Sequence, residues 1–131
     1  MVRRVEWKEV GVESGPTFLA PAYVTSKDTE LVYTSGCVGS DLLTGEIPED
    51  LEKQVRNALD NLGRVLKASN SSFDDVLKIL LFVADGSYAS TVNAVYKEYF
   101  PERPARSCIV VSFPDPTLKV ELECVAAVSS T

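Results

Sequence analysis

An arginine and a glutamate near the carboxyl end of the chain are the residues whose types and spacing best suit chemistry on a small ligand. Arg106 and Glu121 are fifteen residues apart and lie in two consecutive strand-like segments. A guanidinium is a planar fork of donors that fits a carboxylate on a small molecule. If the two strands lie near each other, both side chains can face one small cavity. The alternative is a surface ion pair between them, since most ion pairs have no catalytic role.

Prolines define the two strands that carry these residues. Pro104 and the residue before it favour an extended backbone, which places Arg106 near the start of a strand and not on a helix. The apolar run from Cys108 to Phe113 continues that strand until two further prolines end it. The segment from Val120 to Val128 is predicted to form the next strand.

The rest of the chain reads as strands and two amphipathic helices. The first helix is predicted to begin at Pro48 and to end at 69–72, because apolar residues recur between these points at helical spacing. The second is predicted from about Tyr88 to Phe100. Between them, the apolar run Val76–Val83 is typical of a strand covered on both faces, with a buried helix segment as the alternative. The other predicted strands precede the first helix: an irregular one over 5–12, then 18–23, and 31–34 ended by Gly36.

The predicted order β-β-β-α-β-α-β-β gives the fold class. Two helices that are apolar on one side need a sheet to cover, so we expect a two-layer α+β architecture with both helices on one face of the sheet. Over 107–113 neither side of the strand is strongly polar. An apolar second face on such a sheet indicates burial against another subunit.

Composition narrows the function. A chain of 131 residues is expected to form one domain over 1–131. It has no histidine, which excludes histidine triads and histidine-ligated zinc, and we expect neither a metal nor a cofactor. With 13 basic and 19 acidic residues the net charge is −6, so no nucleic-acid partner is expected.

Cysteine usage and hydropathy bear on the compartment. Three cysteines are an odd number without a disulfide framework spacing, which favours a reducing compartment. The first residues are not followed by an apolar signal core, and no run reaches membrane-spanning length. We therefore expect a cytoplasmic protein with no membrane partner.

Several short motifs, taken in this order and spacing, resemble one family over nearly the whole chain. The resemblance is to the RidA/YjgF family of small trimeric imine deaminases, also labelled L-PSP endoribonucleases. Its strongest part is PARSC at 104–108 followed by Glu121. The other matching segments are Tyr33–Gly36, Leu43–Glu46, Asn57–Leu62 and Val92–Tyr96.

The resemblance implies a fold, an assembly and a reaction. The fold would be the chorismate-mutase-like variant of the ferredoxin-like arrangement, in a homotrimer whose sheets build a central barrel with three clefts between subunits. The reaction would be hydrolysis of reactive 2-imino or 2-enamino acids to 2-oxo acids and ammonia, without a cofactor. The partners would be a small 2-imino or 2-oxo acid and two further copies of the chain.

The resemblance also implies roles for individual residues. Arg106 would anchor the substrate carboxylate, and Glu121 would hold or activate the water. Glu123 points to the same face of its strand, but the fifteen-residue spacing favours Glu121. The remaining predicted substrate-binding residues are Ser35, Gly36, Asn93, Cys108 and Thr17.

Structural interpretations of these residues stay open. A cysteine in an apolar strand usually packs, and Cys108 would contribute chiefly its backbone. A serine before a glycine is often only a strand end, as at Ser35. An asparagine inside a helix, as at Asn93, is more often a solvated or capping side chain.

Two positions depart from the family pattern. Thr17 stands where the family has a pocket tyrosine, and Cys37 stands where it commonly has glutamine. Tyr23 or Tyr33 could supply a ring instead. We interpret the chain as a divergent member that acts on a bulkier or different imine.

Two other functions compete with the deaminase. One is a non-catalytic trimer that binds small carboxylates, as a sensor or chaperone-like protein; Thr17 favours it and Glu121 argues against it. The other is a ribonuclease, which the absence of histidine and the acidic charge disfavour.

Overall fold

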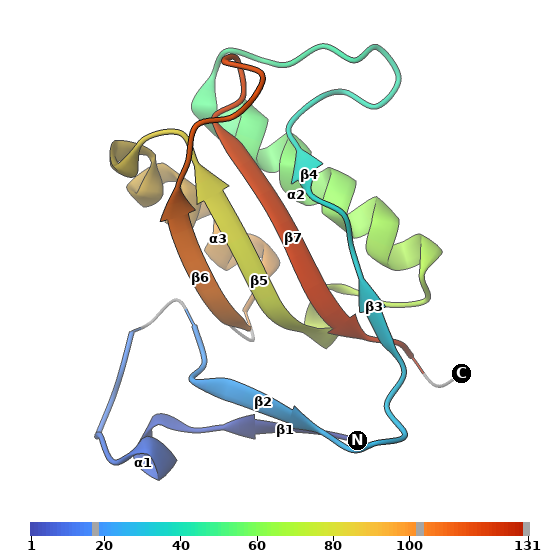
Figure 1. The fold of residues 1–131 in the computed structure, drawn as a ribbon, viewed down its shortest axis with the longest axis vertical. Coiled ribbons are helices and arrows are strands. Elements are labelled where there is room, and N and C mark those ends of the chain that lie inside the picture. Colours follow the sequence, from blue (N-terminus) through green and yellow to red (C-terminus); the bar gives the residue numbers. More distant parts are fainter. Residues whose placement is uncertain (17–18, 102–103, 130–131) are drawn as a thin grey trace.

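A computed structural model describes residues 1–16, 19–101 and 104–129 of the chain. It is an α+β fold with two long helices (Figure 1). The elements in chain order are β1 (Val2–Val5), α1 (Trp7–Val10), β2 (Ala22–Thr25), β3 (Leu31–Tyr33), β4 (Cys37–Val38), α2 (Leu51–Ala68), β5 (Val76–Val83), α3 (Ala89–Tyr99), β6 (Ala105–Val110) and β7 (Val120–Ala127), with 3-10 turns at Phe73–Asp75 and Gly86–Tyr88.

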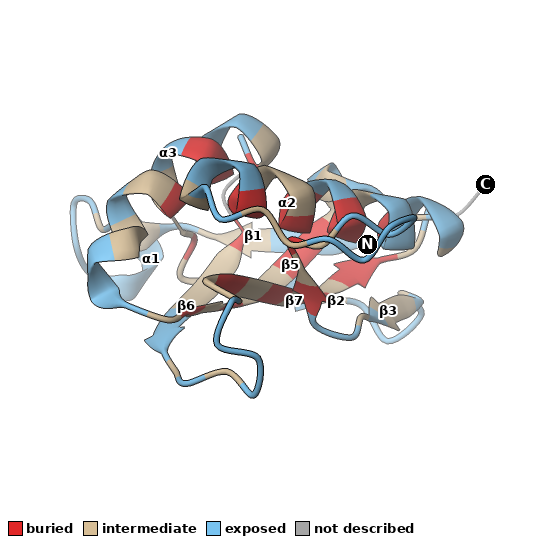
Figure 2. Ribbon diagram, turned by 90° about the horizontal axis from the view of Figure 1, so that it is seen from above, coloured by how far each residue is buried: buried red, intermediate tan, exposed pale blue. Residues whose placement is uncertain are grey.

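The main sheet has the strand order β3-β7-β5-β6. Strand β4 also pairs directly with β7, at residues that precede those paired with β3. The β5–β6 pair is parallel, and the other pairs are antiparallel. Helices α2 and α3 lie side by side on one face of this sheet (Figure 2). The predicted two-layer α+β architecture with both helices on one face is confirmed. Strands β1 and β2 form a separate antiparallel hairpin (Figure 1).

The core lies between the two layers because side chains alternate across each strand. Along most of β5 and β7 every second residue is buried under the helices and the residues between are only partly buried; at the start of β5 and the end of β7 two adjacent residues are buried. The buried positions of these strands are Val76, Leu77, Ile79, Leu81, Val83, Val120, Leu122, Cys124, Ala126 and Ala127.

The second face of the sheet carries no helix among the described residues (Figure 2). On β5 this face presents Lys78, Leu80 and Phe82, all partly exposed. On β6 it presents Ile109, which is 46% exposed. The prediction that 76–83 forms a strand is confirmed, but within one chain only one of its faces is covered. The apolar side chains on the other face are therefore available to pack against a further layer.

The N-terminal segment differs from its prediction. In place of the irregular strand expected over 5–12, β1 ends at Val5 and is followed by the single-turn helix α1. Glu9 Oε2 accepts a hydrogen bond of 2.8 Å from the backbone N–H of Glu6, and Gly11 ends the turn with φ 105°. This local capping outweighs the alternation of Val5 and Trp7 because a glycine adopts positive φ without strain.

Two other boundaries shift for local reasons. Helix α2 begins at Leu51 and not at Pro48, because Asp50 is its N-cap and accepts a hydrogen bond of 3.0 Å from the backbone N–H of Lys53. Strand β6 covers 105–110 and not 107–113, so residues 111–113, just before Pro114, are not part of the strand.

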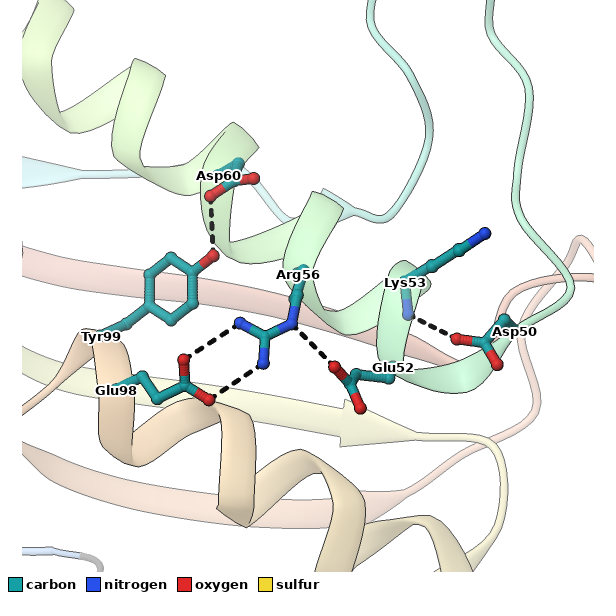
Figure 3. Close-up of polar contacts among 7 residues, drawn as sticks. All are labelled: Asp50, Glu52, Lys53, Arg56, Asp60, Glu98 and Tyr99. Carbon is teal, nitrogen blue, oxygen red and sulfur yellow. Dashed lines mark hydrogen bonds and ion pairs between the residues drawn. The ribbon is translucent and has the colours of Figure 1, made fainter.

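An exposed polar network joins the two long helices (Figure 3). Arg56 on α2 donates two hydrogen bonds to Glu98 on α3, at 3.1 and 3.0 Å, and a third to Glu52. The hydrogen bonds from Arg56 lower the pKa of Glu98. Nearby, Tyr99 donates a hydrogen bond of 2.8 Å to Asp60. These contacts connect α3 to α2 at the surface, where ion pairs stabilise a fold only weakly.

A buried glutamine connects the start of α2 to the loop before β7. Gln54 has 0% exposure, and its Nε2 donates to the carbonyls of Pro48 and Thr117 at 2.9 and 3.1 Å. Its Oε1 accepts a hydrogen bond of 2.7 Å from the backbone N–H of Lys119. Every polar atom of this buried amide is thus paired, as burial of a polar group requires.

We predict that Gln54→Ala lowers the free energy of unfolding by roughly 3 kcal/mol, because it removes packing and leaves buried backbone groups unpaired. Urea denaturation followed by circular dichroism measures this change. Lys53→Ala, an exposed substitution on the same turn of α2, is the control and should stay close to the wild type. Equal stability of the two variants would contradict the role given to Gln54.

Candidate functional site

Arg106 lies on β6, the edge strand, and its side chain turns toward the helices. The register pairs Arg106 with Ile79, and paired residues of neighbouring strands point to the same face of a sheet. Ile79 is part of the core under α2 and α3. The guanidinium carbon of Arg106 lies 4.8 Å from the centroid of the Tyr96 ring on α3. This is a cation–π contact between strand and helix.

Asn93 lies one helical turn before Tyr96 on α3, so the two side chains share a face of the helix. Asn93 Oδ1 and the phenolic oxygen of Tyr96 are both buried, and neither meets a hydrogen-bond partner of good geometry among the described residues. The interpretation of Asn93 as a solvated side chain is therefore wrong for its oxygen. Burial raises the pKa of Tyr96 well above its usual value, and the positive charge of Arg106 opposes this only in part.

Cys108 follows Arg106 by two residues on β6 and shares its face of the strand. Its side chain is exposed. We call Arg106, Tyr96, Asn93 and Cys108 the Arg106 cluster. Three of its four members were predicted from the sequence. Tyr96 was interpreted only as part of an apolar stripe.

Glu121 lies on the opposite face of the sheet. The register of β7 places it beside Phe82 and Val38, whereas its neighbour Leu122 is fully buried under the helices. The carboxylate is partly buried. Burial raises the pKa of Glu121, and the negative charge of Glu123 on the same face raises it further. An acid of this kind holds a proton at a higher pH than an ordinary glutamate does.

Gly36 makes room for the Glu121 carboxylate. A Cβ at this position would collide with Glu121 Oε2 and would lie 2.7 Å from its carboxyl carbon. The register against β7 shifts by one residue between Tyr33 and Cys37, which marks a bulge over 34–36. The bulge brings Gly36 against the carboxylate and leaves Ser35 exposed beside it. Glu121, Glu123, Gly36 and Ser35 form what we call the Glu121 cluster.

Two asparagines of α2 hold the segment that follows the bulge. Asn61 Nδ2 donates hydrogen bonds of 2.8 Å to the carbonyls of Val38 and Ser40. Asn57 Nδ2 donates one of 3.2 Å to the carbonyl of Gly39. Sequence reasoning placed both only on a helix. Their spacing of four residues, which puts two amides on one helix face, was the available signal.

The two clusters are not brought together within one chain. Arg106 and Glu121 point to opposite faces of the sheet. Strand β5 lies between their strands, so the two strands are roughly 10 Å apart, and the two residues are also offset along them. Within a single chain the two side chains do not face one cavity, because side chains alternate across each strand; a crevice between chains that holds both stays a prediction. The same geometry excludes an ion pair between them in one chain.

A groove of about 480 Å³ runs between the edge formed by β3 and β4 and helix α2. Ser35 and Gly36 of the Glu121 cluster line it, together with Asn61 of α2. Tyr33, 72% exposed, stands at its margin. No residue of the Arg106 cluster belongs to this groove.

The remaining sequence predictions concern cysteine, Thr17 and metals. Cys37 is buried, and burial raises the pKa of its thiol, with a further increase from the charge of Glu121. Thr17 lies outside the described residues. No group of three or more potential metal ligands occurs in the part of the chain that the structure describes. Over the same part, none of the helices is both long and apolar enough to span a membrane.

Comparison with known proteins identifies relatives over almost the whole chain. A family model described as Endoribonuclease L-PSP matches residues 18–128. A protein of Escherichia coli K12 named 2-iminobutanoate/2-iminopropanoate deaminase is 35% identical over 124 residues, which cover 91% of this chain and 96% of that protein. Reactive Intermediate Deaminase A, chloroplastic, of Arabidopsis thaliana is 36% identical over 93% of this chain and 66% of that protein.

Solved structures agree with these relatives. The crystal structure of E. coli TdcF with bound serine superposes with a TM-score of 0.71 at 34% identity, covering 80% of this chain and 85% of that one. The fold, the family model and the relatives together show that the chain belongs to the RidA/YjgF family.

We predict that Glu121→Gln stabilises the protein at neutral pH. Because the folded state raises the pKa of Glu121 above 4.5, the wild type bears a cost of ionisation above that raised value. This cost fades as the pH falls through the folded pKa toward 4.5, so the advantage of the glutamine variant should fade with it.

Urea midpoints measured from pH 8 to pH 4 at one protein concentration test this prediction. Glu46→Gln, in an exposed turn, is the control and should follow the wild type. A glutamine variant at position 121 that is less stable than the wild type at pH 7 would contradict it.

Proposed function

We propose that the protein hydrolyses reactive 2-imino and 2-enamino acids to 2-oxo acids and ammonia. The observation that carries this proposal is the Glu121 carboxylate, partly buried against Gly36 with a raised pKa. Such a group keeps its proton to a higher pH than an ordinary glutamate does, and water addition to an imine requires proton transfer. The names of the relatives, a 2-iminobutanoate/2-iminopropanoate deaminase and a reactive intermediate deaminase, support the same reaction.

In this proposal Arg106 holds the carboxylate of the substrate. Stacking on Tyr96 fixes one side of the guanidinium. A bidentate pair of charge-assisted hydrogen bonds then orients the imine carbon. An enamine first gains a proton on carbon and so becomes the imine. Glu121 positions a water molecule and takes its proton as oxygen adds to the imine carbon, and this proton passes to the nitrogen to give a carbinolamine. In a second transfer Glu121 takes the proton of the carbinolamine hydroxyl and gives it to the amine, and the C–N bond breaks as the C=O bond forms. The product is a 2-oxo acid, and ammonia leaves.

The reaction site in this proposal lies between copies of the chain. Arg106 and Glu121 are on opposite faces of one sheet, so they meet only if the Arg106 cluster of one subunit faces the Glu121 cluster of another. The uncovered face with Leu80, Phe82 and Ile109 supplies apolar surface for such an assembly. A homotrimer around a central barrel satisfies these conditions by a three-fold rotation.

We predict that Arg106→Ala and Glu121→Gln each lower kcat/KM by about 100-fold or more, because each removes a charged group from the reacting centre. The assay generates 2-iminopropanoate in situ and follows release of the 2-oxo acid. A wild type no faster than buffer would favour a non-catalytic carboxylate-binding protein. Cleavage of RNA that survives Arg106→Ala would favour a ribonuclease.

Mixing the two inactive variants tests whether the site is shared. After co-refolding at equal amounts, a site that combines an intact Arg106 from one chain with an intact Glu121 from another recovers full function. If the two variants assemble at random, roughly a quarter of all the sites combine the two intact residues. Mixtures that stay as inactive as the parents would refute a site between copies.

We also predict that Gly36→Ala lowers kcat/KM on the order of 10-fold while changing stability little. The added methyl group displaces the far end of the Glu121 side chain, which is flexible and can move at small cost to the fold. Gly86→Ala is the matched control, since a Cβ there has its closest contact at 3.9 Å. Parallel thermal melts separate displacement of the carboxylate from unfolding, and equal activity of both variants would argue against this role for Gly36.

A further inference from the structure

Thr34, the residue at which the chain enters the bulge after β3, completes its pairing with β7 through its side chain. Its backbone N–H donates a hydrogen bond of 3.0 Å to the carbonyl of Cys124. In a regular antiparallel pair of this kind, the second bond returns to a backbone carbonyl. Here the backbone N–H of Cys124 donates to the hydroxyl oxygen of Thr34, also at 3.0 Å. The hydroxyl thus takes the place of a ladder carbonyl at the point where the strand leaves its regular course.

The bulge decides which residue lies on the Glu121 carboxylate. Continued without a bulge, the register of β3 would set Cys37 opposite Glu121. The observed partner of Cys37 is instead Leu122, and both side chains are buried in the core. A shift of one residue turns the following side chains to the other face of a sheet. The bulge therefore takes the Cys37 side chain away from the carboxylate and brings Gly36 against it.

Contacts on both sides of the bulge hold it in place. After it, Asn61 on α2 donates hydrogen bonds of 2.8 Å to the carbonyls of Val38 and Ser40. Before it, the pair between Thr34 and Cys124 ties the chain to β7. Thr34 is only partly buried and lies at an edge of the sheet. Loss of its hydroxyl should therefore loosen the bulge from one side and leave the fold intact.

Cover by Gly36 contributes to the environment of the Glu121 carboxylate. A Cβ at position 36 would lie 2.7 Å from the carboxyl carbon, so the backbone of Gly36 is packed directly on the group. Burial is the main cause of the raised pKa of Glu121, and the charge of Glu123 adds to it. A bulge that moves away admits water, which stabilises the ionised form and lowers the pKa.

Other charged or titratable side chains surround this carboxylate, and a substitution at position 34 replaces none of them. They are Glu123 on β7, Lys78 on β5, and Tyr33 and Cys37 on either side of the bulge. A change in the pKa of Glu121 therefore reports on the position of the bulge.

We propose that Thr34 is a positioning residue whose hydroxyl fixes the bulge that holds Gly36 against the Glu121 carboxylate. The proposal rests on the proposed function in one respect, that Glu121 transfers protons to and from the substrate. The hydroxyl and not the methyl group carries this role, because only the oxygen accepts a hydrogen bond from Cys124. Serine at position 34 should therefore preserve the bulge, whereas valine keeps the branched shape and loses the acceptor.

The first test follows the Glu121 carboxyl carbon by NMR as the pH is lowered, with its resonance assigned by its loss in Glu121→Gln. The resonance should titrate at a lower pH in Thr34→Val than in the wild type, closer to the ordinary value of 4.5. In Thr34→Ser it should titrate as in the wild type. Thr44→Val is the matched control and should leave the titration unaltered, because it removes a hydrogen bond of the same kind, 3.2 Å from the backbone N–H of Glu46, in an exposed turn. If Thr34→Val does not fold, Thr34→Ala takes its place because it also lacks the acceptor.

The second test measures the steady-state parameters for the imine over a range of pH. Thr34→Val should lower kcat/KM roughly 10-fold, since a displaced proton-transfer group loses its alignment with the reacting atoms. The acid limb of its pH profile should move to lower pH together with the pKa of Glu121, and Thr34→Ser should stay within about 2-fold of the wild type. In a Gly36→Ala background, Thr34→Val should have little further effect. A merely structural role would lower activity additively in both backgrounds and leave the acid limb in place.

The outcomes separate this proposal from the proposed function. A Glu121 titration that is the same in Thr34→Val as in the wild type would overturn the positioning role, whatever the activity. An equal shift in Thr34→Ser and Thr34→Val would overturn the role of the hydroxyl. A wild type that does not hydrolyse the imine would overturn the deaminase, and it would leave the role of Thr34 standing if the titration shifts in Thr34→Val and not in Thr34→Ser.

Discussion

The alternation of side chains across a β-sheet is the constraint on which the functional architecture depends. Successive residues of a strand point to opposite faces, and paired residues of neighbouring strands share a face. Pairing with Ile79 turns Arg106 toward the helices, whereas pairing with Phe82 turns Glu121 away from them. No rotation of side chains brings these two groups together through the intervening β5. A site that uses both has to draw on two chains, so the proposed chemistry requires assembly.

Each side of the proposed site relies on a polar group kept in a partly apolar setting. The Glu121 carboxylate is packed on Gly36 at a bulge, where burial and Glu123 make ionisation harder. The Arg106 guanidinium is placed over Tyr96, which is itself held by other rings. Both arrangements need rigid support, because a charged group that can swing into water loses its altered properties. The amides of α2 provide this support on the glutamate side by holding the backbone after the bulge.

Prediction from the sequence succeeded where one local pattern dominated. The apolar run Val76–Val83 is β5, and the stripe of the first helix corresponds to α2. It failed where a capping contact or a register shift decided the outcome. The alternation of Val5 and Trp7 suggested a strand, but hydrogen bonding between Glu6 and Glu9 makes a helical turn. Strand β4 was missed because it depends on a bulge that only pairing with β7 reveals.

The sequence by itself determined the two-layer class, the family and the residue types of the candidate site, because hydrophobic periodicity and short motifs are local properties. Only the tertiary structure decided that Arg106 and Glu121 lie on opposite faces of the sheet, that Gly36 makes room for the carboxylate and that Tyr96 lies beneath the guanidinium. These relations join residues that are far apart along the chain. They follow from strand register and helix placement, which depend on packing of the whole core and not on any single segment.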